Sequence, residues 1–360
     1  MKFIDEYRDG EKARPIIEEI QRLANEPLKL MEVCGTHTVS IARFGLRKAL
    51  PETVDLISGP GCPVCVTSSG DLDMAIAMAQ IPGAMVATFG DMVRVPGSDS
   101  SLALERAGGR DVRVVYSPLD GLKMAEENPQ LKVIFLGVGF ETTAPTVAAT
   151  AIEARNRGLK NFSIFSAHKT VPKALQALVD LGEIKLDGFL LPGHVSAIIG
   201  SRPYEFLAEQ YGLACVISGF EPLDILQSVL MLVRQVKSRR PRVEIQYRRG
   251  VRPEGNPKAM EIMAQAFEPS DVEWRGLGWI PGTGLALQKE LAELDAVRVF
   301  DIHVPLAKET KGCRCGDVLR GLIRPEGCAL FAKACTPQNP LGPCMVSSEG
   351  SCAAAYKYGS

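Results

Sequence analysis

Short apolar runs alternate with helical patterns along most of the chain. The runs at residues 28–33, 84–89, 112–117, 132–137, 161–166, 188–192 and 214–218 have the length and composition of buried strands. Helical spacing of apolar residues predicts helices over 71–80, 145–157 and 222–238. Alternation of this kind is typical of an α/β fold, with parallel sheets covered by helices on both faces.

The same patterns suggest how the chain is divided. Residues 5–24 form an amphipathic helical pattern within an N-terminal segment, 1–27. A division near residue 120 then gives two α/β domains, 28–120 and 121–240, followed by a C-terminal domain, 241–360. Its last 48 residues carry Gly, Pro and Cys in place of helical periodicity. Such a segment buries little apolar surface, so we expect a bound group to hold it together.

Composition narrows the class of protein. Hydrophobic residues make up 46% and charged residues 23% of the 360 residues, which is typical of a globular protein. The formal net charge is -1, so no basic field favours nucleic acid. No secretory signal and no apolar run near the roughly 20 residues of a membrane span are visible. We therefore expect a soluble, cytoplasmic protein without a nucleic-acid or membrane partner.

Ten cysteines then need an explanation, since disulfides are rare in a reducing compartment. Six of them fall in the last 48 residues, and four of these have the spacing Cys313-x14-Cys328-x6-Cys335-x16-Cys352. Four thiolates on loops of this length suit a 4Fe–4S cluster. A structural Zn(Cys)4 site is the alternative, but zinc sites usually show two close cysteine pairs. The spacing favours iron–sulfur. Cys315 and Cys344 remain, as a disulfide or as free thiols.

The N-terminal cysteines have a different character. Cys62 and Cys65 form a C-x-x-C pair before a predicted helix, where helix amides stabilise a thiolate, so we predict a redox pair. Cys34 opens CGTH at the end of a strand, with His37 three residues on, in the crevice where α/β proteins place active groups. Buried packing is the alternative for Cys34. Cys215 lies inside an apolar run and is interpreted as a core residue.

Three further polar residues follow predicted strands. Glu141, His168 and His194 each come directly after an apolar run, so together they would offer one acid and two imidazoles to a strand-end crevice. Each alone could equally be a helix cap or a satisfied turn residue. There is no G-x-x-x-x-G-K-[ST] and no G-x-G-x-x-G sequence, so no motif supports nucleotide binding.

Several of these segments together resemble the HypD family of hydrogenase maturation proteins. They are CGTH (34–37), GPGCPVC (59–65), GFETTAPT (139–146), PGHVSAIIG (192–200) and the four-cysteine tail, so the resemblance extends from residue 34 to residue 352. It implies a three-domain protein with two α/β domains and a C-terminal iron–sulfur domain. It also implies a small HypC-type chaperone as partner, with cyanide supplied through HypF and a HypE-type donor.

The resemblance assigns roles as well. The pair with HypC would be the scaffold on which the Fe(CN)2CO unit of [NiFe]-hydrogenases is assembled, with Cys34 as an iron ligand. Cys62 and Cys65 would be the redox pair, and Cys315 and Cys344 an additional disulfide-capable pair. Cys313, Cys328, Cys335 and Cys352 would hold the 4Fe–4S cluster. We expect a redox-active scaffold rather than a conventional turnover enzyme. The rival hypotheses are a stand-alone 4Fe–4S thiol–disulfide oxidoreductase and a structural zinc protein.

Overall fold

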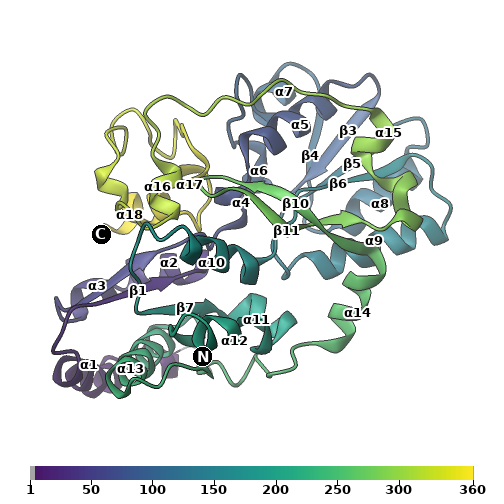
Figure 1. The fold of residues 1–360 in the computed structure, drawn as a ribbon. Helices are drawn as coiled ribbons and strands as arrows, with labels where there is room; N and C mark the ends of the chain where they lie inside the picture. Colours follow the sequence, from purple (N-terminus) through teal and green to yellow (C-terminus); the bar gives the residue numbers. More distant parts are fainter. Residues whose placement is uncertain (1–4, 360) are drawn as a thin grey trace.

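Two parallel sheets form the framework of the computed structural model, which describes residues 5–359 (Figure 1). Sheet A has the strand order β2-β1-β7-β8-β9. Its strands are β1 (Leu28–Glu32), β2 (Val54–Ser58), β7 (Gly188–Pro192), β8 (Ala214–Ser218) and β9 (Val243–Ile245). Sheet C has the order β4-β3-β5-β6, with β3 (Ala84–Thr88), β4 (Asp111–Val114), β5 (Lys132–Gly137) and β6 (Phe162–Ser166). All pairs within both sheets are parallel.

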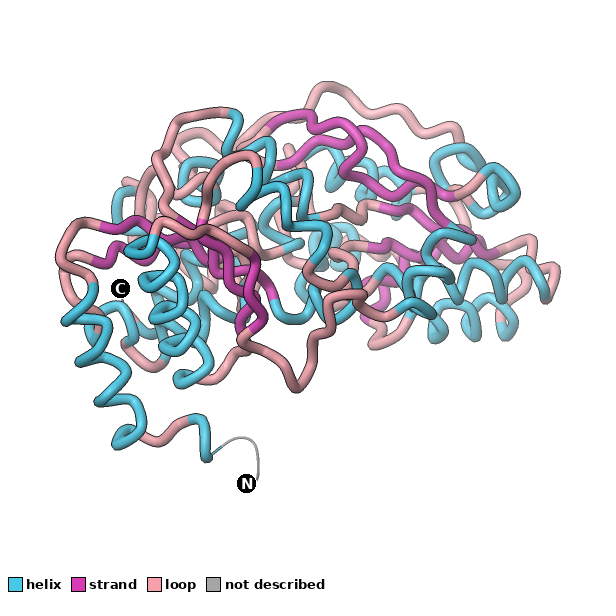
Figure 2. The backbone as a smooth tube through the Cα atoms, turned by 60° about the horizontal axis from the view of Figure 1, so that its bottom comes forward, coloured by secondary structure: helices cyan, strands magenta, loops and turns pink. Residues whose placement is uncertain are grey.

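Helices cover both sheets, and Figure 2 shows the two sets of strands with helices beside them. Those belonging to the α/β part are α1 (Gly10–Leu23), α2 (Gly35–Arg43), α3 (Leu46–Ala49), α4 (Pro63–Val66), α5 (Ser69–Gln80), α6 (Gly90–Val93), α7 (Leu102–Ala107), α8 (Pro118–Glu127), α9 (Ala144–Asn156), α10 (Val171–Asp180), α11 (Gly193–Ile199), α12 (Glu205–Glu209) and α13 (Pro222–Ser238). The C-terminal part adds α14 (Pro257–Ala266), α15 (Ala296–Phe300), α16 (Cys315–Leu319), α17 (Pro343–Val346) and α18 (Ser351–Tyr358).

The strand and helix predictions are confirmed. A strongly periodic segment buries its apolar face whichever sheet it packs against, so its pattern can be recognised from the sequence. The helices expected over 71–80, 145–157 and 222–238 are α5, α9 and α13, and each predicted strand exists within a few residues. In β8, Ala214 and Val216 face one core cluster while Cys215 and Ile217 face another, so the strand is buried on both faces. Cys215 is therefore a core residue, as expected.

The order of the strands departs from the expected division near residue 120. Strands β3 and β4 lie before that position and β5 and β6 after it, yet all four belong to sheet C. The chain leaves sheet A after β2, builds sheet C, and returns through α10 to β7. Hydrophobic runs report that a strand is buried, but they do not identify the sheet in which it pairs, so a boundary near residue 120 divides the strands of sheet C.

The first residues of the expected C-terminal domain, 241–360, pack on the two sheets and do not form a core of their own. Strand β9 completes sheet A, and α14 packs on α9. An antiparallel hairpin follows, formed by β10 (Phe267–Trp274) and β11 (Gly278–Leu287), and it crosses the middle of the molecule (Figure 1). The cysteine-rich end, drawn in yellow, is compact only from about Cys313 onwards. Within residues 5–359 no helix combines the length and hydropathy of a membrane span.

Phe135, at the centre of β5, is fully buried between β3 and β6 and provides a test of the sheet C core. Phe135→Ala should lower the free energy of unfolding by about 3–5 kcal/mol, because it removes a large apolar group and leaves a cavity. Leu104→Ala is the control, since Leu104 on α7 is 62% exposed and should change stability by less than about 0.5 kcal/mol. Urea unfolding measures both, and equal losses would contradict this placement of the core.

Candidate metal and thiol site

Cys34 lies directly after β1, at the carboxyl edge of sheet A. Its backbone is extended, and it occupies the N-cap position of α2. The side chain is 7% exposed. The amides of Thr36 and His37 point towards its sulfur, as helix N-terminal amides do. The strand-end position expected from the sequence is therefore confirmed, and Cys34 is both buried and surrounded by polar groups.

Gly61 packs directly on the Cys34 backbone. A Cβ atom on Gly61 would collide with the amide nitrogen of Cys34, so only glycine fits there. The Gly35 amide donates to the Gly61 carbonyl over 2.8 Å. On the other side, the Glu349 side chain covers Gly35 and accepts a hydrogen bond from Thr36 Oγ1 at 2.8 Å. The CGTH turn is thus held between a loop from β2 and the C-terminal segment.

Burial controls the ionisation of this turn. It raises the pKa of Cys34 to about 12, and the charges of Glu349 and Glu32 add to that effect. Glu32 is fully buried, and burial raises its pKa to about 7, although it accepts hydrogen bonds from the Cys34 amide at 3.1 Å and from Thr38 Oγ1 at 2.5 Å. The Cys34 side chain is accordingly a neutral thiol at neutral pH.

Two histidines lie on the ring of Phe220 beside this turn. His37 stacks on Phe220 with 5.2 Å between ring centroids, and His194, from the start of α11, stacks at 3.8 Å. His37 Nε2 lies 3.0 Å from the Gly219 carbonyl oxygen, so Nε2 carries the proton and Nδ1 is left as a lone pair. Burial lowers the pKa of His37 to about 4 and also lowers that of His194. Both imidazoles are neutral at pH 7.

The C-x-x-C pair is a disulfide. Cys62 and Cys65 are joined at the start of α4, and both are buried. Cys62 is the N-cap residue of α4, where its sulfur accepts the Cys65 amide at 3.2 Å. Since Gly61 touches Cys34, the disulfide begins one residue away from the contact that supports the CGTH turn.

The C-terminal cysteines surround one small cavity. Its walls are formed by six cysteine side chains together with apolar residues such as Phe331 and Met345. The six are Cys313, Cys315, Cys328, Cys335, Cys344 and Cys352. The sulfurs of Cys315 and Cys344 are 2.8 Å apart, and this hydrogen bond lowers the pKa of Cys315 and raises that of Cys344.

This donor set suits an iron–sulfur cluster. In the described part of the chain, no three His, Cys, Asp or Glu side chains are arranged to hold a single metal ion. A cuboidal cluster instead takes its thiolates from around a body of several atoms, and thiols that line a common cavity provide that arrangement. Backbone amides add to the fit, since the Leu341 amide donates to the Cys335 sulfur at 3.3 Å.

The disulfide and the cysteine-lined cavity belong to one core. Helix α4 packs against both α16 and α17, which carry Cys315 and Cys344. Cys62, Cys65 and four of the six cavity cysteines, Cys315, Cys335, Cys344 and Cys352, are members of the same cluster of buried residues, and Cys313 packs against it. The fold therefore brings together three cysteine sets that are up to 318 residues apart in the chain, from Cys34 to Cys352.

Glu141 and His168 lie at the end of sheet C rather than on sheet A. Glu141 Oε1 accepts the Val171 amide at 3.0 Å, and burial raises the pKa of Glu141 to about 7. His168 Nδ1 lies 3.1 Å from Ser166 Oγ, and burial lowers the pKa of His168 to about 3. Burial raises the pKa of Tyr204, and Glu141 and Cys34 act in the same direction. Glu141 and His168 thus follow strands of sheet C, whereas His194 follows a strand of sheet A.

Two residues of this site were missed from the sequence. Glu32 carried a signal, since it is the one acidic residue of the strand just before Cys34. Glu349 carried none, because its contact with Thr36 joins residues 313 positions apart. Only the path of the chain reveals it.

The fold and these contacts define an α/β protein with a centre lined by thiols. A family model, HypD, described as "Hydrogenase formation hypA family", matches residues 11–359. The chain is 48% identical to the hydrogenase maturation factor HypD of Rhizobium leguminosarum bv. viciae, with 100% of this chain and 96% of that protein covered. It is 45% identical to the HypD of Escherichia coli (strain K12), over 99% and 98%. The chain belongs to the HypD family of hydrogenase maturation factors.

The ionisation of Cys34 can be measured by alkylation. With its pKa near 12, the rate of Cys34 modification by iodoacetamide should rise about tenfold per pH unit from pH 7 to pH 10, because only the thiolate reacts. Glu349→Gln should speed the reaction by removing a negative charge, whereas Glu127→Gln, on the exposed end of α8, should not. Mass spectrometry of the Cys34 peptide measures the rate, and a plateau below pH 9 would contradict the buried, neutral thiol.

Proposed function

We propose that this chain is the scaffold on which the Fe(CN)2CO unit of a [NiFe]-hydrogenase is assembled, in complex with a small HypC-type chaperone and supplied by a HypE-type cyanide donor. Membership of the HypD family supports a role in hydrogenase maturation. The observation that carries the finer proposal is the packing of Cys34, the Cys62–Cys65 disulfide and the six-cysteine cavity around one centre.

Cys34 is the residue proposed to hold the iron unit, which is the cargo of the scaffold. A soft thiolate suits low-spin Fe(II) carrying cyanide and CO. The buried thiol is neutral without metal, so binding of the iron releases its proton and the ion compensates the thiolate charge. His37 and His194, neutral and stacked on Phe220, provide a rigid wall beside this position.

Cys313, Cys328, Cys335 and Cys352 are proposed to hold a resident 4Fe–4S cluster. Such a cluster supplies one-electron transfer when it is bound. The Leu341 amide and the Gly312 carbonyl lie beside the sulfurs of Cys335 and Cys328, where they position these side chains. Cys315 and Cys344, already in contact, remain as a second thiol pair.

The Cys62–Cys65 pair is proposed to be redox-active. Reduction of its disulfide consumes two electrons and two protons and produces two thiols, and oxidation reverses this. The position of this pair supports such a role, since Gly61, just before Cys62, contacts Cys34, and α4 packs against α16 and α17. We place this chemistry in a reducing compartment such as the cytoplasm, where free thiols persist.

A stand-alone thiol–disulfide oxidoreductase is the second candidate, because the Cys62–Cys65 disulfide packs against the helices carrying Cys315 and Cys344. The two candidates differ in what is bound. A scaffold co-purifies with a small partner and with iron that shows infrared bands of cyanide and CO. An oxidoreductase shows neither, and it reduces disulfides in the absence of a partner.

The tail assignment predicts which cysteines are needed for the cluster. Cys328→Ala or Cys335→Ala should remove iron and acid-labile sulfide and destabilise the cysteine-rich end, because cluster binding contributes its folding energy. Cys315→Ala and Cys344→Ala should retain the cluster. Cys215→Ala is the matched control, since Cys215 is equally buried but lies in β8. Iron and sulfide near wild-type levels in the first two variants would refute the ligand set.

The scaffold proposal depends most on Cys34. Cys34→Ala, purified with its small partner, should keep the fold and the cluster but lose the infrared bands of cyanide and CO, because alanine provides no ligand. His37→Ala should weaken these bands without eliminating them. Cys215→Ala again serves as the control and should leave the bands unchanged. If the bands persist undiminished in Cys34→Ala, the iron unit is held elsewhere.

A further inference from the structure

A large cavity lies where elements of both sheets meet the hairpin β10–β11. Helix α14 packs against α11 and β10, while α10 packs against β11, and residues of these five elements line the cavity. Ile199 comes from α11 beside sheet A, whereas Glu141 and Thr170 follow strands of sheet C. The volume is about 450 Å³, within the range of roughly 300–1,000 Å³ that is usual for small-molecule sites. Such sites often lie at junctions of this kind.

The walls of this cavity are mostly apolar. Met260 and Met263 lie three positions apart on α14, and they line it together with Phe267 and Leu285. Methionine side chains are unbranched and adapt to ligands of irregular shape. The space is many times the roughly 30 Å³ that one water molecule occupies in the liquid, and water against apolar walls finds few partners. A ligand with an apolar body would therefore gain free energy by displacing this water.

One oxygen of a buried carboxyl group in the wall has no partner. Glu141 lines the cavity and is 4% exposed. Its Oε1 accepts the Val171 amide at 3.0 Å. Its Oε2 is buried and accepts no hydrogen bond from any other residue of the described range 5–359. A buried acceptor that stays unpaired is unfavourable, so Oε2 is the atom at which a hydrogen-bond donor of a ligand gains most.

No lysine or arginine of the described chain forms an ion pair with this carboxyl group. Burial raises the pKa of Glu141 to about 7, and only backbone amides, its own and that of Val171, act in the opposite direction. Lys169, two residues before Val171, pairs with Asp71 at 3.0 Å instead. Lys173 also lines the cavity, but it is exposed, so water and salt screen its charge. An ammonium group would supply both the donor and the positive charge that Glu141 lacks.

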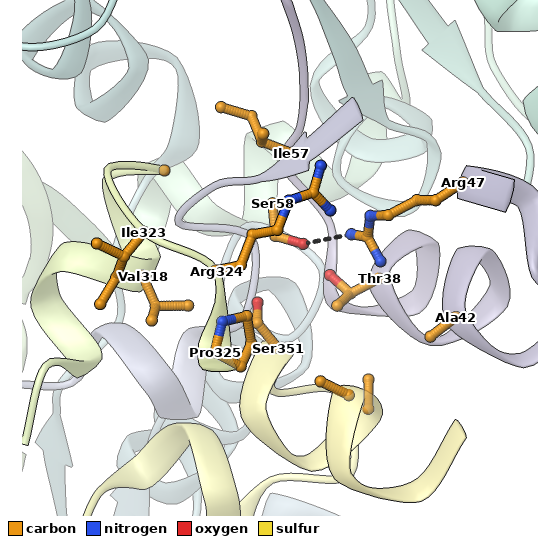
Figure 3. A pocket seen from close by; sticks show the side chains of 13 residues that line it. Thr38, Ala42, Arg47, Ile57, Ser58, Val318, Ile323, Arg324, Pro325 and Ser351 are labelled. Atoms are coloured by element: carbon orange, nitrogen blue, oxygen red, sulfur yellow. Dashed lines mark hydrogen bonds between the residues drawn. The ribbon is translucent and has the colours of Figure 1, made fainter. Parts of the chain in front are cut away.

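The small cavity between sheet A and the cysteine-rich end offers no comparable group. Its volume is about 30 Å³, and two arginines line it. Arg47 Nη2 donates to Ser58 Oγ at 3.0 Å, as Figure 3 shows, and Arg324 Nη2 donates to Asp55 at 2.7 Å. Both arginines thus have partners within the protein, in contrast to Glu141 Oε2.

We propose that the large cavity is a binding site for one small primary amine with an apolar body. The ammonium group would donate to Glu141 Oε2, and the apolar body would lie against Met260, Met263 and Phe267. None of the described cysteines lines this cavity, so the site is distinct from the thiol centre. The inference does not depend on the iron chemistry proposed above, because it uses no thiol and no metal.

Calorimetric titration of the full-length protein with 2-phenylethylamine tests the site. Saturable binding of one amine per chain is expected. The alcohol 2-phenylethanol has the same apolar body without the charge, and it should bind about tenfold more weakly. Glu141→Gln keeps an acceptor for the Val171 amide but removes the charge, so it should weaken amine binding about tenfold and leave binding of the alcohol unchanged. Glu268→Gln is the matched control, since Glu268 is exposed beside Phe267 but does not line the cavity.

Four results would overturn the proposal. They are an absence of saturable amine binding, equal affinity for the amine and the alcohol, equal amine affinity in Glu141→Gln and wild type, and tighter binding of 3-phenylpropanoate than of the amine. The last result would show that Lys173 anchors the ligand instead of Glu141. If Glu141→Gln does not fold, crystals of the wild type soaked in 2-(4-bromophenyl)ethylamine replace it. The anomalous signal of bromine must then lie beside Met260 and Met263, and its absence there refutes the site.

Discussion

Gly61 lies against the backbone of Cys34 so closely that no side chain fits between them, and the rest of the centre depends on this contact. It fixes the loop after β2 on the turn after β1, two strands that are neighbours in sheet A. Because Cys62 follows Gly61 directly, the same contact sets the position of the disulfide and of α4. Helix α4 in turn provides the surface on which α16 and α17 pack.

Burial then determines the charge state of the groups that this packing gathers. Glu32, Cys34 and His37 are all enclosed, and in each case burial favours the neutral form. At pH 7 Cys34 and His37 are therefore neutral, and the Glu32 carboxyl is near its pKa of about 7. A cation that binds there meets ligands whose protons it must displace, which couples its binding to proton release.

The interleaved path of the chain is what makes such a centre possible. Sheet A supplies Cys34, which follows β1, and His194, which follows β7. All the strands of sheet C lie between these two strands in the sequence. Sheet C carries Glu141 and His168 after the carboxyl ends of β5 and β6. The hairpin β10–β11 fills the space between the two sheets, with Trp274 stacked on Phe140 and bonded to Thr283. A chain divided into consecutive domains would place these groups on separate cores.

The sequence alone determined the strands, the main helices and the chemical character of the centre. Periodicity reveals which residues face a core, and the spacing of Cys62–Cys65 and of the tail cysteines reveals thiol chemistry, because both signals are local. The tertiary structure decided the order of the strands, the hairpin β10–β11 and the contact of Glu349 with the CGTH turn. These features join residues up to hundreds of positions apart, and a local pattern of burial contains no information about which distant segment provides the partner.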